Sequence, residues 1–328
     1  MRILVTGGAG YIGSVITERL VERGDTPVVL DNFYQGHREA LPAQVQLVQA
    51  DLADLQALER VFRGGHMEAV MHLAAVSVVG DSVREPVRYY RENVGNLLPL
   101  LEAMERGGCR RMVFSSSAAV YGEPTEIPIG EECATRPVNP YGWTKLMGER
   151  VLSDAAAAGD GTGALRFVSL RYFNVAGATK ASGEMHHPET HLIPRVLEAA
   201  AGERPHVELY GTDYPTPDGT CIRDYIHVVD LAEAHVLALD RTRSASGVYN
   251  LGNNRGYSVR EVIQCASRVT GREIPVVNHP RRGGDPPQLI ASHRKAAEEL
   301  DWKPQRGLEE MIASAWEWRA AHPRGYLQ

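Results

Sequence analysis

Short apolar runs alternate with longer stretches of helical periodicity through the first half of the chain. The apolar runs predict buried strands at residues 2–6, 27–30, 45–48, 69–73, 111–114 and 166–170. The stretches between them repeat apolar side chains every three to four positions and predict helices at 15–21, 54–62, 86–104 and 141–152. Strands that alternate with helices pair in parallel, and near-continuous apolar strands are covered on both faces. The pattern predicts a doubly wound, parallel α/β sheet.

This alternation fades after about residue 176. Three segments are rich in Gly and Pro and are typical of loops, namely 177–188, 211–219 and 279–287. Helical periodicity continues at 192–201, 229–239, 259–269 and 308–319, and a further apolar run covers 248–251. We therefore expect a first domain over 1–176, to which the chain returns at about 225–255. A smaller, loop-rich C-terminal lobe should cover 177–328.

Charge and cysteine content restrict the class of partner. The chain has 35 basic and 41 acidic residues, a net charge of −6, and no run of five or more Lys or Arg, so we expect no nucleic-acid partner. No apolar stretch approaches the roughly 20 residues of a membrane helix, and no leader pattern is present at the start. The four cysteines lie far apart without a C-x-x-C pair, which argues against a disulfide framework. We expect a cytoplasmic protein without membrane association.

A metal site is not expected either. His187 and His191 are four residues apart, but Pro188 lies between them and the sequence shows no evident third ligand.

Glycines follow the first predicted strand directly. Gly7, Gly10 and Gly13 have G-x-x-G-x-x-G spacing, and Gly8 with Gly10 and Gly13 also satisfies G-x-G-x-x-G. Glycines at a strand-to-helix turn let backbone N–H groups approach a pyrophosphate at the positive end of the helix dipole. The alternative is a tight structural turn. Because Asp31 ends the second strand about 20 residues on, where a carboxylate accepts from an adenosine ribose, the first domain is predicted to be an NAD(P)-binding Rossmann fold.

The residues around Asp31 favour NAD over NADP. A carboxylate there repels a 2′-phosphate, and residues 32–34 contain no Arg to bind one, although Arg38 follows nearby. Asp51, at the end of the third strand, is either an adenine contact or a cap of the next helix.

Tyr141 and Lys145 are four residues apart on one helix face, after the helix-start signal Asn139-Pro140. A tyrosine has a pKa of about 10, so its use as a base near neutrality needs a shift of about three units, or about 4 kcal/mol. A neighbouring ammonium and a positive nicotinamide favour the phenolate. Ser117 ends the fifth strand, where open α/β proteins bind ligands. The other interpretation of the pair is an exposed i, i+4 contact.

These motifs resemble the extended short-chain dehydrogenase/reductase family and, within it, the UDP-glucose 4-epimerases, over essentially the whole chain. The shared blocks are G-G-A-G-Y-I-G at 7–13, L-D-N at 30–32, V-G-D-S-V at 79–83, F-S-S-S-A-A-V-Y-G at 114–122, N-P-Y-G-W-T-K at 139–145, R-Y-F-N-V-A-G-A at 171–178, D-Y-P-T-P-D-G-T-C-I-R-D-Y-I-H-V at 213–228 and P-R-R-G-G-D at 280–285. The first and fifth blocks are general to the superfamily, whereas the last three are narrow.

The resemblance implies an NAD-dependent isomerase that interconverts UDP-glucose and UDP-galactose. C4 is oxidised transiently, the 4-keto sugar turns over, and the hydride returns to its other face. By this resemblance Tyr141 is the acid/base, Ser117 hydrogen-bonds the sugar and Tyr141, and Lys145 holds the nicotinamide ribose. The implied NAD contacts are Gly7, Gly10, Tyr11, Ile12, Gly13, Asp31, Asn32, Asp51, Leu52, Leu73, Ala74, Ala75, Ser77, Asn93, Tyr141, Lys145 and Phe173. Ser77 stands where some relatives have a Lys.

The C-terminal lobe is implied to hold the UDP-sugar. The implied substrate contacts, with Ser117 and Tyr141, are Asn174, His191, Leu192, Val207, Tyr210, Arg223, Arg282, Asp285 and Leu289. Guanidinium groups suit bidentate phosphate binding, and the alternative for both arginines is surface ion pairing. His191 departs from the Asn of some relatives. Leu289 is intermediate between a large Tyr and a small residue at this place, so the pocket is expected to admit a 2-acetamido group.

Two other functions compete with this interpretation. One is a 4-epimerase acting on UDP-glucuronate or UDP-xylose, and the other is a catalytically silent NAD-binding regulator, which would lack the intact Ser117, Tyr141 and Lys145. Dehydration is not expected, since Ala118 and Ala119 replace the Asp-Glu pair of the related dehydratases. The resemblance also implies a homodimer formed through helices 86–104 and 141–152.

Overall fold

The computed structural model describes residues 1–159, 163–283 and 285–326. In this part of the chain, seven parallel strands form a central sheet in the order β10-β6-β5-β4-β1-β2-β3. The strands β1 to β6 and β10 are Arg2–Thr6, Thr26–Asp31, Gln46–Gln49, Ala69–His72, Arg111–Ser117, Arg166–Tyr172 and Gly247–Leu251. The strand order reverses at β1 and β4, which is where open α/β sheets bind ligands. The predicted doubly wound Rossmann-type sheet is confirmed.

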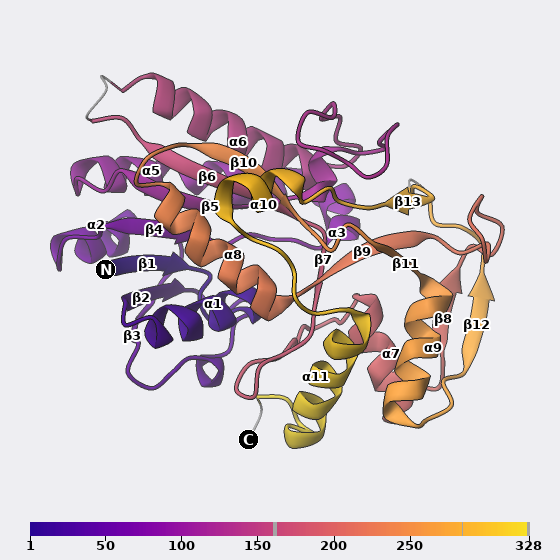
Figure 1. Cartoon of the computed structure of the whole chain (residues 1–328). Helices are drawn as coiled ribbons and strands as arrows, with labels where there is room; N and C mark the ends of the chain where they lie inside the picture. The colour runs from indigo at the N-terminus through magenta and orange to yellow at the C-terminus, as the bar shows by residue number, and fades with distance from the viewer. Residues whose placement is uncertain (160–162, 284, 327–328) are drawn as a thin grey trace.

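Helices cover both faces of this sheet (Figure 1). The helices α1 (Tyr11–Glu22) and α8 (Val228–Arg241) pack on one face, and α2 (Leu55–Arg63), α5 (Leu97–Arg106) and α6 (Pro140–Ala157) pack on the other. Along β1, Ile3 and Val5 face the core under α1 and α8, and Leu4 faces the core under α2, α5 and α6. All three side chains have no exposed area. Because side chains alternate between the faces of a strand, a sheet covered on both sides needs uninterrupted apolar runs.

The helix predicted at 86–104 is interrupted. It consists of α4 (Pro86–Tyr90), a π-helical turn at Arg91–Gly95, and α5. The π turn carries the buried side chain of Asn93, and such turns often occur at functional sites. A further short helix that the pattern did not predict, α3 (Val79–Arg84), precedes it.

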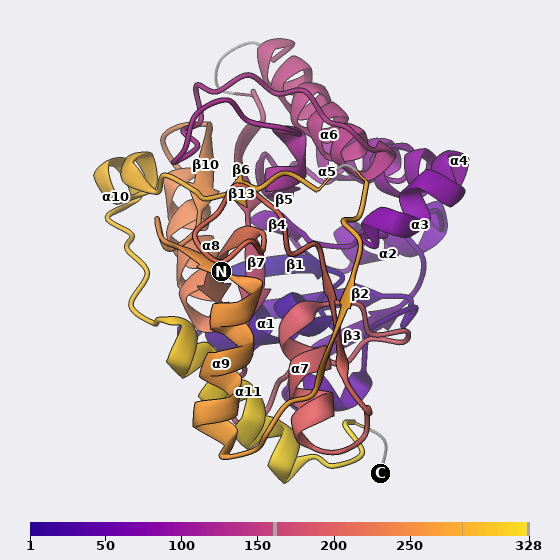
Figure 2. The ribbon, with the colours of Figure 1, turned by 90° about the vertical axis from the view of Figure 1, so that its right-hand side faces the viewer.

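The C-terminal half contributes two small sheets. Strand β9 (Ile222–His227) pairs with β7 (Asn174–Ala176), β11 (Gly256–Ser258) and β13 (Gln288–Leu289), whereas β8 (Val207–Tyr210) pairs with β12 (Val276–His279). The helices α7 (Leu192–Ala200), α9 (Val259–Thr270) and α11 (Leu308–Ala321) share one core, and Figures 1 and 2 show them grouped at one end of the molecule. The remaining α-helix in the described residues is α10 (Arg294–Leu300), and two short 3-10 helices cover Arg38–Ala40 and Ala118–Val120. Between these elements the chain returns to the large sheet through α8 and β10, which pairs with β6.

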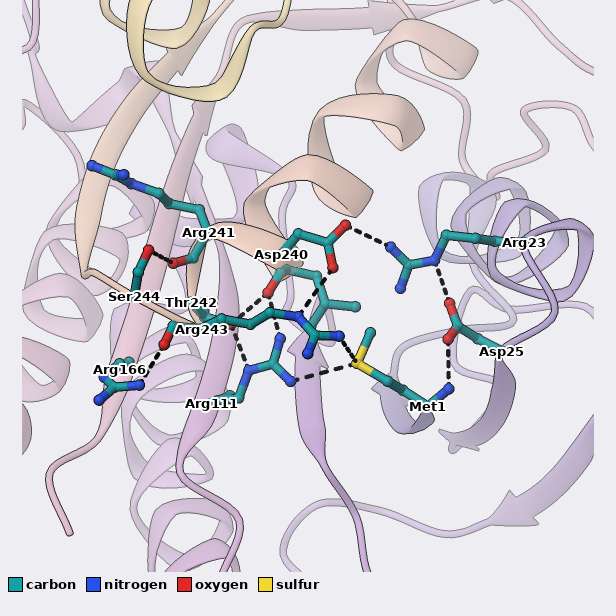
Figure 3. A network of polar contacts seen from close by, with 11 residues as sticks. Met1, Arg23, Asp25, Arg111, Arg166, Asp240, Arg241, Thr242, Arg243 and Ser244 are labelled. Atoms are coloured by element: carbon teal, nitrogen blue, oxygen red, sulfur yellow. Dashed lines mark hydrogen bonds and ion pairs between the residues drawn. The ribbon is translucent and has the colours of Figure 1, made fainter. Parts of the chain in front are cut away.

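A polar network ties the amino ends of the large sheet's strands to the end of α8 (Figure 3). Arg111, the first residue of β5, donates to Thr242 Oγ1 at 3.0 Å. Arg23 bridges Asp25 and Asp240 with contacts of 2.5 and 3.1 Å, and the N-terminal ammonium pairs with Asp25 at 2.7 Å. Ligands of open α/β sheets bind at the opposite, carboxyl ends of the strands, so we assign this network to stability.

Within the described residues, no helix combines the length and the apolar character needed to cross a bilayer. All four cysteines are free thiols.

Candidate active site

The glycine loop between β1 and α1 is built for close backbone approach. Gly7 has φ +70°, and a Cβ there would lie 2.6 Å from the Ala74 nitrogen. A Cβ on Gly13 would lie 2.1 Å from the Gly7 oxygen. Gly10 precedes α1 as its cap residue and provides no side-chain cap. The first N–H groups of α1 are therefore available to an anion at the positive end of the helix.

Asp31 lies next to this loop at the end of β2. Its carboxylate is 7% exposed and accepts hydrogen bonds from the Ala9 and Phe33 amides at 2.9 and 2.8 Å. Burial raises the pKa of Asp31, and the two amide hydrogen bonds oppose that rise. This buried carboxylate is the acceptor that an adenosine ribose requires.

Asn32 and Asp51 are brought together, because Asn32 Nδ2 donates to Asp51 Oδ2 at 2.8 Å. The alternative role of Asp51 as the cap of α2 is wrong: Asp54 is the cap residue and accepts from the Ala57 amide at 3.0 Å. Asp51 instead accepts from the Ala53 amide in the turn before the helix. Leu52 beside it is buried in the core.

The chain after β4 forms the wall opposite the glycine loop. The amides of Leu73 and Ala74 both donate to the Thr6 carbonyl at 3.0 Å. Beyond them, Ala75 and Ser77 are exposed. Asn93 accepts from the Val76 amide at 2.9 Å and donates to the Val76 carbonyl and to Thr144 Oγ1, both at 3.0 Å. Asn93 therefore positions this wall against α6 with its own amide group.

Helix α6 approaches the end of β5 closely because one of its residues is glycine. Asn139 Oδ1 accepts from the Gly142 amide at 2.9 Å and Pro140 occupies the first turn, so the predicted helix start is confirmed. A Cβ on Gly142 would lie 2.5 Å from the Ala119 oxygen. This contact sets α6 against the turn that follows Ser117.

Ser117, Tyr141 and Lys145 converge at this point. Lys145 is 4% exposed; its Nζ donates to the Ser115 carbonyl at 2.8 Å and lies 5.8 Å from the centroid of the Tyr141 ring. Burial raises the pKa of Tyr141, and a hydrogen bond with Ser117 opposes that rise. Burial lowers the pKa of Lys145 to about 7. Desolvation thus outweighs the expected stabilisation of the phenolate by Lys145, and a cationic ligand is needed to favour that form.

Replacing Lys145 by Met should stabilise the cofactor-free protein at low pH. The Lys145 pKa falls from 10.5 to about 7, so below pH 7 the buried ammonium destabilises the fold, and net of the lost hydrogen bond we expect a gain of about 2–4 kcal/mol. Between these two values the folded chain binds fewer protons than the unfolded chain, so wild-type stability rises with pH and the gain shrinks. Urea unfolding at several pH values measures this. A variant less stable than wild type at about pH 6 would contradict it.

A buried polar network behind Ser117, Tyr141 and Lys145 was not found by the sequence analysis. Glu149 and Arg171 are almost fully buried and form a bidentate pair at 2.9 and 2.6 Å. Arg171 also donates to Tyr121 Oη at 2.8 Å, and Tyr121 donates to Asn250 Oδ1 at 2.7 Å. A signal was present, since Glu149 continues the four-residue spacing of Tyr141 and Lys145 along α6. The network links α6, β6 and β10 beneath the site.

On the substrate side, the structure brings Arg223 and Asp285 together. Arg223 donates to the carbonyls of Ile222 and Pro286, both at 2.9 Å, and to Asp285 Oδ1 at 3.3 Å. The guanidinium of Arg282 stacks on Tyr210, 3.9 Å from its ring centroid.

A small apolar cluster joins the triad to the C-terminal lobe. Ala118, Phe173 and Ala291 form part of it, and Leu289 packs against it. Asn174 follows Phe173 and its Nδ2 donates to the Asp224 carbonyl at 2.8 Å.

Asp224, missed by the sequence analysis, positions the segments around Leu289. It is fully buried and accepts from the Asn253, Asn254 and Ala291 amides at 2.7, 3.1 and 3.0 Å. Burial raises its pKa to about 7 against these hydrogen bonds.

Two of the expected substrate contacts have other partners in this structure. The side chain of Val207 is 2% exposed and belongs to the core of the C-terminal lobe, because residues of β8 alternate between core and surface. His191, next to Leu192 at the start of α7, directs Nδ1 at Glu184 and Glu189. The substrate contacts expected at Val207 and His191 stay predictions.

Replacing Gly13 by Ala is expected to weaken dinucleotide binding about 10- to 100-fold. The added methyl group must displace the Gly7 carbonyl, and overpacking of this kind costs about 1–3 kcal/mol. Dinucleotide content per purified chain and its dissociation constant measure the effect. Gly80→Ala is the matched control, because a Cβ there meets no atom within 4 Å. Equal dinucleotide retention by the two variants would refute the role of the turn.

Comparison with known proteins agrees with this geometry. The profile described as "NAD dependent epimerase/dehydratase family" matches residues 3–252. A UDP-glucose 4-epimerase of Streptomyces lividans is 50% identical over 99% of this chain and 98% of its own length. Two solved structures also match closely. That of UDP-glucose 4-epimerase from Brucella ovis in complex with NAD has a TM-score of 0.92 at 46% identity, covering 100% of this chain and 99% of that one.

The second, of UDP-glucose 4-epimerase from Bifidobacterium longum in complex with NAD+ and UDP, has a TM-score of 0.94 at 39% identity, covering 99% of this chain and 100% of that one. The chain belongs to the NAD dependent epimerase/dehydratase family. The three relatives named here, which it matches over nearly their full length, are UDP-glucose 4-epimerases.

Proposed function

We propose that the chain interconverts UDP-glucose and UDP-galactose with bound NAD. One observation carries this function: Ser117, Tyr141 and Lys145 converge at the carboxyl end of β5, in a chain that matches UDP-glucose 4-epimerases over nearly their whole length. The glycine loop and Asp31 fit NAD, since they offer free helix N–H groups and a buried ribose acceptor without a 2′-phosphate partner. NAD, when bound, supplies reversible acceptance of a hydride from the sugar.

The proton of the C4 hydroxyl is handled by the chain itself. Tyr141, as phenolate, takes this proton during oxidation and gives it back when the 4-keto group is reduced on its other face. Ser117 lowers the pKa of the Tyr141 phenol, and it is the proposed ligand of the same sugar oxygen. The two residues after Ser117 cannot catalyse loss of water from the 4-keto sugar, because Ala118 and Ala119 carry no acid or base.

The UDP group is held away from the reacting carbon. Arg223, Arg282 and Asp285 are the proposed diphosphate and ribose contacts, with Tyr210 near the base. Strong binding at this remote end leaves the hexose free to turn over between oxidation and reduction.

The test is incubation of the purified protein with UDP-galactose without added NAD, followed by chromatography of the products. We expect UDP-glucose to form, because NAD is regenerated in each cycle and stays bound. Failure to form UDP-glucose, with the chain folded and NAD present, would overturn the proposal. Parallel incubations with UDP-glucuronate and UDP-xylose test the competing substrates.

We also propose activity on UDP-N-acetylhexosamines, supported by Leu289, which packs on the Ala118 and Phe173 cluster. Replacing Leu289 by Tyr should lower kcat/KM for UDP-N-acetylglucosamine about 10- to 100-fold and change that for UDP-glucose only a few-fold, because the larger side chain fills the acetamido space. Leu289→Met is the matched control of similar volume. No wild-type turnover of the acetylated sugar would refute this part.

We propose a homodimer through α4, α5 and α6, the helices expected at 86–104 and 141–152, together with α3, which packs against α4 and α6. Large apolar side chains are exposed there, namely Val79, Val83, Val87, Leu98, Trp143 and Met147. Val87 is 67% exposed, and a second copy of the chain would cover such a surface. Light scattering should give twice 36.0 kDa for the wild type and the monomer mass for Val87→Asp. Val277→Asp, at an exposed apolar position on β12, is the control; a monomeric wild type would refute the proposal.

We further propose that residues 1–176, with the return at 225–255, form the cofactor domain and that 177–328 hold the sugar nucleotide.

A cytoplasmic location is proposed as well, supported by the four free thiols. Recovery of the native protein outside the cytoplasmic fraction of its source cells would contradict that location.

A further inference from the structure

Four metal-ligating side chains lie close together in one short segment, and only His191 among them is also an expected substrate contact. Glu184, His186, Glu189 and His191 each offer one ligand atom, and these atoms all lie within 4.8 Å of one another. His191 Nδ1 lies 2.9 Å from Glu184 Oε1 and 2.8 Å from Glu189 Oε1. His186 Nδ1 lies 3.4 Å from Glu184 Oε1 and 3.9 Å from Glu189 Oε2.

The two carboxylates are buried without a permanent cation. The side chains of Glu184 and Glu189 are 9% and 8% exposed. Among the described residues, only the two histidines form ion pairs with them, and no Lys or Arg does. The buried His186 Nδ1 makes no hydrogen bond to a described residue. Two nearly buried carboxylates and an imidazole nitrogen without a hydrogen bond would be stabilised by a cation between them, and His191, 51% exposed, leaves such a cation accessible from solvent.

We propose that these four residues form a Zn²⁺ site. A tetrahedral zinc with bonds of about 2.0–2.2 Å separates its ligand atoms by about 3.3–3.6 Å. The nitrogen–oxygen distances of 2.8, 2.9, 3.4 and 3.9 Å, which involve both oxygens of Glu189, lie on both sides of that range. Two imidazole nitrogens favour zinc over Mg²⁺ or Ca²⁺, which prefer all-oxygen ligands. Two carboxylates with two neutral imidazoles also balance the charge of the ion.

The alternative occupant of the centre is a proton on each histidine. Burial disfavours the charged form of Glu184, but His191 and, to a smaller extent, His186 lower its pKa to about 2. The same attraction raises the pKa of His191. Protonated histidines would thus also neutralise the carboxylates, and metal content distinguishes the two states.

The site would stabilise the segment 184–191, which contains all four ligands and is hydrogen-bonded to the cofactor domain through its backbone. Gln35 Nε2, in the loop after β2, donates to the His187 carbonyl at 3.1 Å, and His37 Nε2 lies 3.3 Å from the Met185 carbonyl. At the other end, His191 is the residue before α7. A metal here would hold the segment that runs from the cofactor domain into α7. The sequence analysis considered the pair His187 and His191 and expected no metal there; in the structure His187 is exposed and does not join the cluster.

Metal analysis tests the inference on the intact protein. The chain is purified without a polyhistidine tag, dialysed against Zn²⁺ and then against metal-free buffer, and its zinc is counted by mass spectrometry. We expect about one zinc per chain in the wild type and in the matched control His187→Ala, and a reduction of at least 10-fold in His186→Ala. Substitution by Co²⁺ should give the intense visible absorption of a tetrahedral centre. EDTA should lower the melting temperature of the wild type and His187→Ala only.

Absence of zinc and of the cobalt absorption from a folded wild type would overturn the proposal and leave protonated histidines as the occupants. If His186→Ala does not fold, Glu189→Gln serves instead, and the wild-type measurement stands without either variant. Equal zinc in the wild type and both ligand variants would place the metal elsewhere. None of these measurements depends on epimerase turnover, so failure of the zinc site and failure of the proposed reaction are distinguishable.

Discussion

Replacing Tyr141 by Phe is expected to lower kcat for epimerisation by about 10²- to 10⁴-fold. The phenol oxygen is the group placed to move the C4 proton, and Phe keeps the ring in its buried place beside Lys145. Because only the hydroxyl is lost, NAD content and the KM for UDP-galactose should change little. Initial rates with UDP-galactose, together with NAD content per chain, measure both effects.

Tyr257→Phe, which removes a hydroxyl on β11 in the C-terminal lobe, is the matched control and should retain wild-type turnover. A Tyr141→Phe protein with turnover close to that of the control would show that another group moves the proton. A variant that has lost NAD would show instead that the phenol mainly holds the cofactor.

Removal of Glu149 should give the largest loss of stability. In Glu149→Ala the guanidinium of Arg171, 6% exposed, loses both contacts of its bidentate pair, and an unpaired buried charge destabilises a fold by about 3–5 kcal/mol. Turnover should fall too, because the same network supports α6 below Tyr141 and Lys145. Urea unfolding of the NAD-bound protein and initial rates measure the two effects.

Helix α6 offers its own control for this prediction. Arg150 and Asp154 form a pair in which the side chains are 78% and 61% exposed, and exposed pairs contribute about 0.2–1 kcal/mol. Arg150→Ala should therefore change stability by less than about 1 kcal/mol. The double variant Glu149→Ala/Arg171→Met should recover part of the loss, since no charge is then left buried. Equal losses in Glu149→Ala and Arg150→Ala would refute the account.

Local patterns predicted most of the large sheet. Strands β1, β2 and β4, and the apolar parts of β5 and β6, are buried on both faces, so their signal is strong and local. The C-terminal lobe was harder to predict. Its strands β7 and β13 have three and two residues and exist only because β9 pairs with them, so their own sequence carries little signal.

The site residues likewise divide into those that local sequence patterns predicted and those that they did not. Gly7, Gly13 and Asp31 were found because backbone approach and a strand end require those residue types at those places. Asp224 was missed, since its hydrogen-bond donors lie about 30 and 67 positions away in the chain. The proposed zinc ligands were missed because the packing of the loop turns His186, rather than His187, toward the two carboxylates. Sequence spacing does not show this orientation.

The sequence by itself determined the parallel sheet, the dinucleotide turn and the spacing of Tyr141 and Lys145. These depend on backbone conformation and on periodicity along single segments. The tertiary structure alone decided the protonation of the site, because burial raises the pKa of Tyr141 and lowers that of Lys145 to about 7. Desolvation depends on atoms from the whole chain, which no local pattern records. The cationic ligand that the phenolate needs is therefore a requirement of the folded site.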